Sequence, residues 1–598
     1  MSPRTYGGLV KIESDAANQR EAFIVGLDFG TTCSGVAYAS TGNPDLIQVV
    51  IGWPVHDGPR NTEGEKTATA IRYVRSGKVT SIQWGGTIHD DEEALRWFKL
   101  LLAELGNKYR KAEHILHVED KIARLNKQPG QVIADYLGKL WEKAIESIDN
   151  EVGSFENARL HIVMTIPAIW TGQAQDAMEA AARQAGLLKK PGTKLSFISE
   201  PEAAAMATLR DAMGRADLRV GDSFIVVDCG GGTTDLISYR ILKLDPLTVE
   251  EVAEGAGDVC GARDCDAKFE AVLKQKFGED YWERLPKSNL REIIRDHWEF
   301  GMKRIYGLDS TKPFSIPVPW ECWGGSQNPV GDDLPIITFE RLEIEDIFEP
   351  TFTKILELVT EQIKRVQGKT RTPPKYIMLV GGFGRCGHLF ERMKEHVSTT
   401  KIKVLQAKHA LPWTAVCRGA VIHGLNQQKT SSKQKVAIES RIARASYGIC
   451  QDEEQGRGAM KDLEYDELLG RNIARNQMKW LIRKGNKLST KKASQGKFSM
   501  CVAKDERPSK HKIYTSNKSP PPKRRDANVQ EFCVVRFDPK KAQKIINFDD
   551  LDPMTSEDGE TFYNLEFEYD MTFHCGKFEF AVFYKGEVIG RAGATMEY

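Results

Sequence analysis

The chain has 598 residues, and its 84 Lys and Arg residues almost balance its 83 Asp and Glu residues, giving a formal net charge of +1. One hydrophobic core rarely serves so long a chain, so we expect several domains. The balanced charge excludes the whole-molecule field of a protein that binds nucleic acid or anionic membranes nonspecifically. Because apolar runs stay shorter than the roughly 18 residues that span a bilayer, we expect a cytoplasmic protein, with the nucleus as a second candidate compartment.

The cysteines are typical of an ordinary reduced protein. Eleven of them are spread along the chain without a Cys-x-x-Cys pair, a pattern that fits free thiols better than a disulfide framework. Cys260 and Cys265 lack a second pair of ligands at suitable spacing. We therefore expect ordinary thiols at these positions rather than a structural zinc site.

Strand and helix patterns alternate from residue 23 onward, after a polar leader at residues 1–20 that we expect to be disordered. Strands are expected where short apolar runs end at turn residues, and helices where apolar residues recur at helical spacing. The expected strands are 23–27, 35–39, 161–167 and 196–198, and the expected helices are 131–148 and 173–185. This order predicts an α/β unit with crossover connections.

The α/β pattern restarts at residue 224 and continues to about residue 425. A hairpin is expected over 224–241, a mixed helical region to about residue 307, and then helix 344–366, strand 376–380 and helix 389–397. Residues 426–444 are polar and rich in Lys, Ser and Gln, so we predict a linker there.

Residues 445–598 carry short alternating or apolar runs between Gly, Asp and Pro residues, which is typical of an antiparallel β domain. Within them, residues 518–525 form a basic, proline-rich segment. We predict a solvated loop there, with a nuclear-localisation signal or a patch for an anionic partner as the alternative.

Two glycine- and threonine-rich turns carry the main functional signal. Asp28-Phe29-Gly30-Thr31-Thr32 and Asp228-Cys229-Gly230-Gly231-Gly232-Thr233-Thr234-Asp235 each follow an apolar strand. Glycine lets backbone N–H groups approach phosphate oxygens closely because it has no Cβ. Two such turns, in two α/β units, predict a nucleotide held between two lobes.

The side chains of these turns suit phosphoryl transfer, which needs a divalent ion, donors for phosphate oxygens and a group that positions the attacking hydroxyl or water. Asp28 and Asp228 are candidates to face a Mg²⁺ ion through its water shell. The threonines and glycine N–H groups are candidate phosphate contacts. A third glycine-rich turn, Gly381-Gly382-Phe383-Gly384-Arg385, follows a further strand.

The three turns resemble the two phosphate motifs and the adenosine motif of the superfamily of actin, sugar kinases and heat-shock ATPases. Ile198-Ser199-Glu200-Pro201-Glu202-Ala203-Ala204-Ala205 resembles the connecting motif of the heat-shock protein 70 family. The sequence at residues 163–168 also resembles this family. The resemblance runs from residue 23 to about residue 425. It implies an α/β fold, a two-lobed actin-like ATPase with ribonuclease H-like lobes, followed by a mainly antiparallel β domain.

The resemblance also implies domain limits. Residues 21–425 would form the nucleotide-binding domain, with lobe I at about 21–220, lobe II at about 221–375 and a return to lobe I at about 376–425. Residues 426–444 would be the linker. Residues 445–598 would be a substrate-binding-like domain.

The resemblance implies roles for single residues. The catalytic residues would be Asp28, Glu200, Asp228, Thr233 and Lys99, with Asp28 and Asp228 nearest the metal. Phosphate-side contacts would come from Gly30, Thr31, Thr32, Cys33, Gly230, Gly231, Gly232 and Thr234, and adenosine-side contacts from Lys303, Arg304, Gly381, Gly382 and Arg385. Arg385 would stack on adenine as a planar cation. For Lys99 the alternative is an exposed lysine on an amphipathic helix.

Several positions depart from the family pattern. Trp413 stands where the family has an acidic residue, Arg263 replaces an acid in Gly261-Ala262-Arg263-Asp264, and Glu299 is displaced by one residue. The segment 427–435 lacks the apolar run of the family's linker, so coupling between ATP and the β domain is not implied. With no helical lid or acidic tail, the chain resembles the divergent branch typified by heat-shock protein 12A.

Three functions fit these observations. The first is an ATP-hydrolysing, chaperone-like switch that uses ATP or ADP with Mg²⁺ and acts on protein clients or co-chaperones, with no specific nucleic-acid partner. The second is a noncatalytic scaffold or filament former that responds to nucleotide. The third is a sugar or polyol kinase, for which the sequence shows no acceptor motif.

Overall fold

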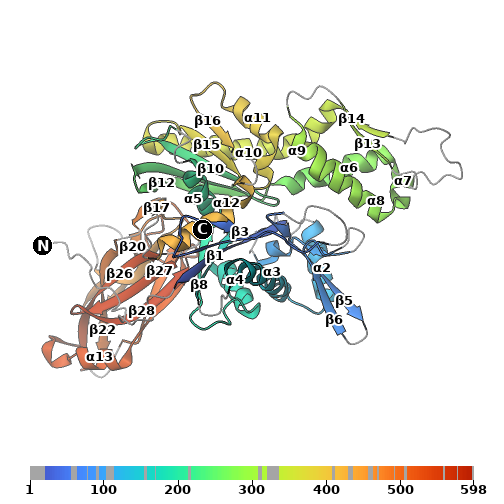
Figure 1. Ribbon diagram of the computed structural model, residues 1–598. Coiled ribbons are helices and arrows are strands. Elements are labelled where there is room, and N and C mark those ends of the chain that lie inside the picture. Colours follow the sequence, from blue (N-terminus) through green and yellow to red (C-terminus); the bar gives the residue numbers. More distant parts are fainter. Residues whose placement is uncertain are drawn as a thin grey trace, which may run out of the picture.

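The protein is described by a computed structural model in which two α/β lobes lie against each other and a β-rich unit lies beside them (Figure 1). The polar leader predicted for residues 1–20 falls outside the described part of the chain. The structure describes residues 21–55, 64–76, 79–88, 93–102, 113–153, 158–168, 170, 172–212, 217–307, 313–318, 336–406, 411–428, 436–454, 462–467, 470–489, 492–503, 508–556, 559–574 and 577–595.

Lobe I is built on a six-stranded sheet with the order β3-β2-β1-β8-β9, and β4 pairs with β2. β1 and β2 form the predicted antiparallel hairpin, and β8 runs parallel to β1 and β9. A small sheet, β6-β5-β7, extends this lobe. The strands are β1 (Ala22–Phe29), β2 (Cys33–Ser40), β3 (Gln48–Val49), β4 (Thr67–Ala68), β5 (Ala70–Ser76), β6 (Val79–Trp84), β7 (Leu95–Arg96), β8 (Arg159–Ile166) and β9 (Lys194–Ser199).

Helices cover both faces of this sheet, so β1 is buried on both sides and is a continuous apolar run rather than an alternating one. Phe23, Val25 and Leu27 pack toward α3 and α4, whereas Ile24 packs with the helices between the lobes. The helices of lobe I are η2 (Phe98–Leu102), α2 (Glu113–Arg124), α3 (Pro129–Val152) and α4 (Gly172–Gln184). The amphipathic patterns predicted over 131–148 and 173–185 are confirmed as α3 and α4.

Lobe II has a seven-stranded sheet with the order β16-β15-β10-β11-β12-β17-β21. β10 and β11 form the second predicted hairpin, and β15 runs parallel to β10. A separate pair, β13 and β14, joins the helical part of the lobe. The strands are β10 (Ser223–Cys229), β11 (Thr234–Leu244), β12 (Leu247–Asp258), β13 (Phe314–Pro317), β14 (Ile336–Phe339), β15 (Tyr376–Val380), β16 (Lys403–Gln406), β17 (Val436–Ile442) and β21 (Lys487–Ser489).

The outer helices of lobe II form a hydrophobic core together with the β10 residues Ile225, Val227 and Cys229. They are α6 (Ala262–Phe277), α7 (Glu279–Arg284), α8 (Lys287–Glu292), η3 (Ile293–Met302), α9 (Lys303–Ile305), α10 (Arg341–Thr370), η5 (Phe383–Arg385) and α11 (Gly387–His396). α10 and α11 match the helices predicted over 344–366 and 389–397.

Two helices lie between the two sheets and join the two lobes into one unit. α5 (Glu200–Ala212) and α12 (Leu411–Asn426) share a core with Ile24 of β1 and Val226 of β10. They approach so closely that a Cβ on Gly419 would lie 1.7 Å from the Ala203 carbonyl oxygen. Since α5 begins at Glu200, its packing fixes that residue between the lobes.

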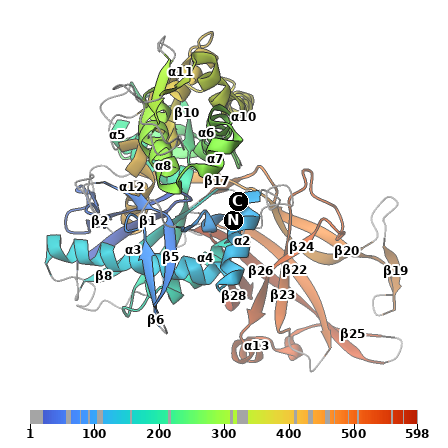
Figure 2. The same cartoon turned by 90° about the vertical axis from the view of Figure 1, so that its right-hand side faces the viewer.

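The C-terminal unit contains a ten-stranded, mainly antiparallel sheet, as expected, with the order β19-β20-β18-β23-β24-β28-β27-β26-β22 and β25 paired to β26. It lies beside lobe I in both views (Figures 1 and 2). In the described part of this unit the helices are the short α13 (Pro539–Ile545) and η6 (Phe548–Asp550). The strands are β18 (Ser446–Glu454), β19 (Leu463–Asp466), β20 (Arg471–Ile482), β22 (Ser494–Ala503), β23 (Lys510–Ser516), β24 (Gln530–Phe537), β25 (Pro553–Thr555), β26 (Thr561–His574), β27 (Lys577–Tyr584) and β28 (Glu587–Thr595).

The segment predicted as a polar linker, 426–444, includes strand β17, which pairs in parallel with β12 and so belongs to the lobe II sheet. β21, from the C-terminal unit, pairs with β17 on the other side. The sequence did not indicate this strand because charged side chains interrupt its apolar residues, so it has no continuous apolar run. Residues 429–435 of the predicted linker lie outside the described residues.

The helices of the described residues were also compared with the length and hydropathy of a membrane span. Within those ranges, no helix is long and apolar enough to cross a bilayer.

Candidate functional site

The two predicted phosphate turns occupy equivalent positions in the two lobes. In the first hairpin Asp28 pairs with Gly35, and in the second Asp228 pairs with Asp235. Both aspartates stand at the ends of buried central strands and are themselves 4% and 7% exposed. The sheets therefore deliver one carboxylate from each lobe to the same region.

The two turns face each other directly. A Cβ placed on Gly231 would lie 2.5 Å from the Thr32 Oγ1 atom, and one on Gly232 would lie 3.2 Å from the Thr31 Cγ2 atom. Gly381, in the third turn, adopts a φ of +87°, and its Cβ would lie 2.3 Å from the Asp228 Oδ1 atom. A Cβ would collide with the opposing turn at Gly231 and with the Asp228 carboxylate at Gly381, and it would crowd Thr31 at Gly232.

Gly381→Ala is expected to weaken nucleotide binding and to lower the free energy of unfolding by about 1 kcal/mol or more, because the left-handed backbone and the Asp228 contact both resist a Cβ. Gly221→Ala is the matched control, since Gly221 also has a positive φ, +93°, but a Cβ there meets no described atom within 4 Å. Isothermal titration with ADP and thermal denaturation measure both effects. Equal behaviour of the two variants would contradict the assignment.

Carboxylates gather between the turns. Burial raises the pKa of Asp228 well above its usual value, and the neighbouring carboxylates of Glu200, Asp235 and Asp28 raise it further. Burial and then Glu200 raise the pKa of Asp235 to about 7. Their mutual influence places these carboxylates in one buried acidic cluster.

Two buried lysines partly neutralise this acidic cluster. Lys99 Nζ lies 2.5 Å from Glu200 Oε1, and Lys66 Nζ lies 2.5 Å from Asp28 Oδ2. Lys99 is 1% exposed and belongs to η2, so the alternative of an exposed lysine on an amphipathic helix is wrong. Burial raises the pKa of Glu200, while the positive charge of Lys99 opposes the rise.

The donor set fits a hydrated Mg²⁺ ion better than a directly ligated metal. Within the described ranges, no three His, Cys, Asp or Glu side chains converge into a direct metal site. The Oδ1 atom of Asp235 is buried and has no hydrogen-bond partner among those residues. An ion that keeps most of its water shell, as Mg²⁺ does, can satisfy this oxygen and relieve the repulsion between Asp28 and Asp228.

Three of the predicted contacts are already engaged within the protein. The Thr234 hydroxyl donates to the Cys260 carbonyl at 2.9 Å, and the Gly230 N–H donates to the Thr233 carbonyl at 2.9 Å. Lys303 is held by Asp266 at 2.7 Å and by Glu299 at 2.5 Å. In this geometry these groups shape the turns and the helix beside them, rather than presenting a free donor to a ligand.

The predicted adenosine side brings Arg304 and Arg385 together around one aromatic ring. The Cζ atoms of the two arginines lie 5.8 and 4.9 Å from the ring centroid of Trp413. Gly381 joins this group to the turns, because its N–H donates to the Pro412 carbonyl at 3.4 Å.

Arg263 connects the two lobes across the site. Its guanidinium Cζ lies 4.7 Å from the ring centroid of Trp97, so a cation on α6 of lobe II contacts an aromatic ring of lobe I. Burial lowers the pKa of Arg263 to about 10, which leaves it charged at neutral pH. Arg263, which stands where the family has an acidic residue, thus takes part in a cation–π contact between the lobes.

The cysteines near the turns are buried or half-buried. Cys260 and Cys265 are buried and unpaired, and burial raises the pKa of each thiol to about 12. Cys33 is half-buried at the start of β2, and burial raises its thiol pKa as well.

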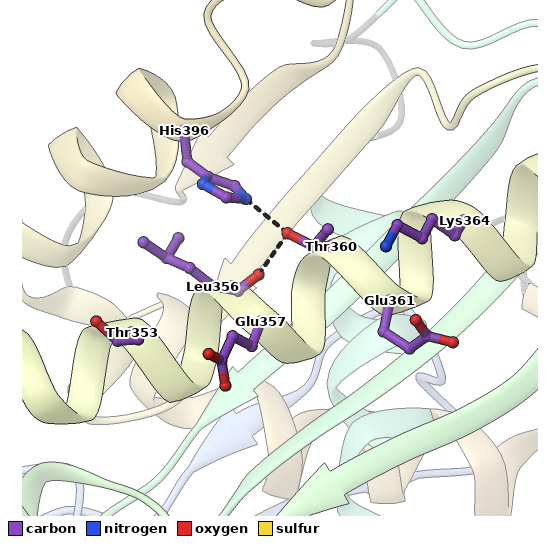
Figure 3. Close-up of a pocket in the computed structure, with 7 residues that line it drawn as sticks. All are labelled: Thr353, Leu356, Glu357, Thr360, Glu361, Lys364 and His396. Carbon is purple, nitrogen blue, oxygen red and sulfur yellow. Dashed lines mark hydrogen bonds between the residues drawn. The ribbon is translucent and has the colours of Figure 1, made fainter.

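A surface groove on lobe II lies away from the predicted site. It is lined by Thr353, Leu356, Glu357, Thr360, Glu361, Lys364 and His396 (Figure 3). The Thr360 hydroxyl donates to the Leu356 carbonyl at 2.8 Å, so the His396 Nε2 atom, 2.7 Å away, donates to Thr360. None of the predicted site residues lines this groove.

Two residues near the turns were not predicted as site residues. Asp235 closes the second motif two positions after Thr233, and its place in that motif was a usable signal. Lys66 follows residues 56–63, which lie outside the described part of the chain, and carries no local motif. Only its contact with Asp28, 38 positions away, reveals it.

Two sheets with paired hairpins at a shared acidic site define the class of two-lobed, actin-like ATPases. A model of the family described as Hsp70 protein matches residues 90–449, which is more than half of the chain. The chain therefore belongs to the Hsp70 family. A second model, described as a domain of unknown function (DUF8568), matches residues 441–594.

The chain is similar to curated relatives along most of its length. Heat shock 70 kDa protein 12A of Mus musculus is 24% identical over 517 residues, which cover 73% of each chain. Heat shock 70 kDa protein 12B of Homo sapiens is 24% identical over 71% of this chain and 72% of its own. A chaperone protein HscA homolog of Neisseria meningitidis is 24% identical over 68% of this chain and 60% of its own. The resemblance drawn from the sequence motifs is confirmed.

Proposed function

We propose that the chain is a chaperone-like ATPase that hydrolyses ATP to ADP and phosphate and transmits the change to its β domain, which acts on protein partners. The observation that carries this proposal is the Lys99–Glu200 pair, buried beside the aspartates of both hairpins. Membership of the Hsp70 family supports ATP as the nucleotide.

Each group has a defined task in this proposal. Asp28 and Asp228 would hold the water shell of Mg²⁺, which neutralises phosphate charge when bound. Ionised Glu200 accepts a hydrogen bond from the attacking water and orients it. Lys99 keeps Glu200 ionised, because its charge counteracts the effect of burial on the Glu200 pKa.

The contacts between the lobes and the C-terminal unit support coupling. Arg441, in β17, makes a bidentate ion pair with Glu202, at 2.5 and 2.9 Å. Glu202 is on the same first turn of α5 as Glu200. The Arg441 guanidinium also lies 5.4 Å from the ring centroid of Phe573, in β26. One end of α5 therefore holds Glu200 in the site and is linked through Arg441 to Phe573 of the β domain.

Other ion pairs strengthen this junction. Glu251 of β12 accepts hydrogen bonds from Arg444 at 2.5 Å and from the Ile442 N–H at 2.8 Å. Glu250 and Glu254 pair with Lys487 and Lys484, at 2.7 and 3.2 Å. These contacts support a docked β domain in which charged pairs replace the apolar linker of the family.

The direct test is phosphate release from Mg²⁺-ATP by the purified full chain, with and without added sugars or polyols. Steady release without an acceptor, with ADP as the product, supports the ATPase. Release only with an acceptor would indicate a kinase. ATP binding without release, together with nucleotide-dependent sedimentation of polymers, would favour the noncatalytic scaffold.

Arg263→Ala is expected to speed ADP release by about 3- to 10-fold, since the cation–π contact with Trp97 that joins the lobes is lost and such a contact contributes about 0.5–1 kcal/mol or more. Stopped-flow chase of a fluorescent ADP analogue measures the rate. Arg263→Lys keeps the charge and should lie between the wild type and the alanine variant. An unchanged rate in both variants would show that the contact does not limit release.

A further inference from the structure

Trp413 lies where two predicted base contacts meet. It is half-buried near the start of α12, and the guanidinium groups of Arg385 and Arg304 lie over its ring. The preceding residue, Pro412, accepts a hydrogen bond from Gly381, whose Cβ position lies against Asp228. Trp413 therefore follows directly on a residue that is hydrogen-bonded to Gly381, and Gly381 lies beside Asp228 of the acidic cluster.

A guanidinium plane binds a nucleobase and an indole by the same interaction, stacking of a delocalised cation on a π face. A face that holds the indole is not available to a base at the same time. Arg385 is partly desolvated here, since burial and then the charge of Arg304 lower its pKa. The indole, which offers its negative face to both cations, offsets their mutual repulsion.

We propose that Trp413 is an intramolecular occupant of the base subsite, which a nucleotide base must displace in order to stack on Arg385 and Arg304. The inference rests on the proposed nucleotide site and deepens it. Affinity then comes mainly from the phosphates and the two glycine-rich turns, while the base contributes little net free energy. Trp413 thereby sets how tightly this chain holds adenine nucleotides.

The test compares Mg²⁺-ADP with Mg²⁺-pyrophosphate by isothermal titration to the full chain. Trp413→Ala should bind ADP about tenfold more tightly than wild type, because two cation–π contacts no longer compete with the base. Pyrophosphate, which has no base, should bind both proteins within about twofold. Trp413→Phe keeps a smaller ring and should lie between them, which controls for a general effect of altering α12.

The outcomes separate the two levels of the proposal. If wild type binds ADP but Trp413→Ala binds it equally or more weakly, the inference is overturned and the nucleotide site stands. If pyrophosphate affinity rises as much as ADP affinity, Trp413 does not act on the base and the inference is likewise overturned. If neither protein binds ADP or pyrophosphate, the proposed function itself fails, and this inference fails with it.

Discussion

Glu200→Gln is expected to lower the rate of ATP hydrolysis by about 100-fold or more, while the affinity for ADP changes less than about threefold. The amide keeps the shape of the side chain but is a poor acceptor for the attacking water, and general-base positioning of this kind contributes about 10²–10⁴ in rate. Single-turnover phosphate release and isothermal titration measure the two quantities. Glu142→Gln, at an exposed carboxylate of α3, is the control.

Removal of Lys99 gives the same assignment a second readout. Since Lys99 counteracts the effect of burial on the Glu200 pKa, Lys99→Gln should raise that pKa further. Hydrolysis needs ionised Glu200, so the acid limb of the pH–rate profile should move to higher pH. Wild-type turnover in Glu200→Gln would show that Glu200 does not orient the attacking water. An unchanged acid limb in Lys99→Gln would show that Lys99 does not keep Glu200 ionised.

Arg441→Ala is expected to destabilise the protein by about 3–5 kcal/mol, because it leaves the Glu202 carboxylate buried without its partner. The two side chains are 10% and 4% exposed, so solvent screens their interaction little. Thermal and urea unfolding measure the loss. Lys497→Ala is the matched control, since its side chain and that of its partner Glu568 are 68% and 52% exposed and an exposed pair contributes about 1 kcal/mol or less.

A double variant separates stability from coupling. Arg441→Met with Glu202→Leu replaces the buried pair by apolar side chains, which is often close to neutral for stability. We expect it to recover most of the stability lost in Arg441→Ala, while ATP no longer changes hydrogen exchange in the C-terminal unit. A fully coupled double variant would show that the ion pair has only a structural role.

The sequence predicted those parts of the molecule that depend on local pattern. Strands β1 and β10 could be predicted because both faces of each strand are buried, which gives a continuous apolar run, and because each run ends at aspartate and glycine. Helix α3 was readable because Val132, Tyr136 and Leu140 recur at helical spacing. Motif resemblance added Glu200 and Lys99, which the fold brings into one ion pair across 101 positions.

The parts that could not be predicted depend on contacts between distant, polar segments. β17 carries Arg441 and Ser440 within a segment predicted as a polar linker, so its pairing with β12 was missed. Lys66 and Asp28 are brought together only by the fold, because no sequence motif links them. Thr234 was predicted as a nucleotide contact, but its hydroxyl donates to Cys260, and a side chain's hydrogen-bond partner within a turn is not encoded in the motif.

The most direct test of a coupled nucleotide switch is amide hydrogen exchange of the full chain with and without Mg²⁺-ATP. The account predicts slower exchange in both hairpins, around residues 28–35 and 228–235, together with changed exchange in β17 and β21, where the C-terminal unit joins lobe II. Unaltered exchange at either hairpin in the presence of saturating Mg²⁺-ATP would contradict it.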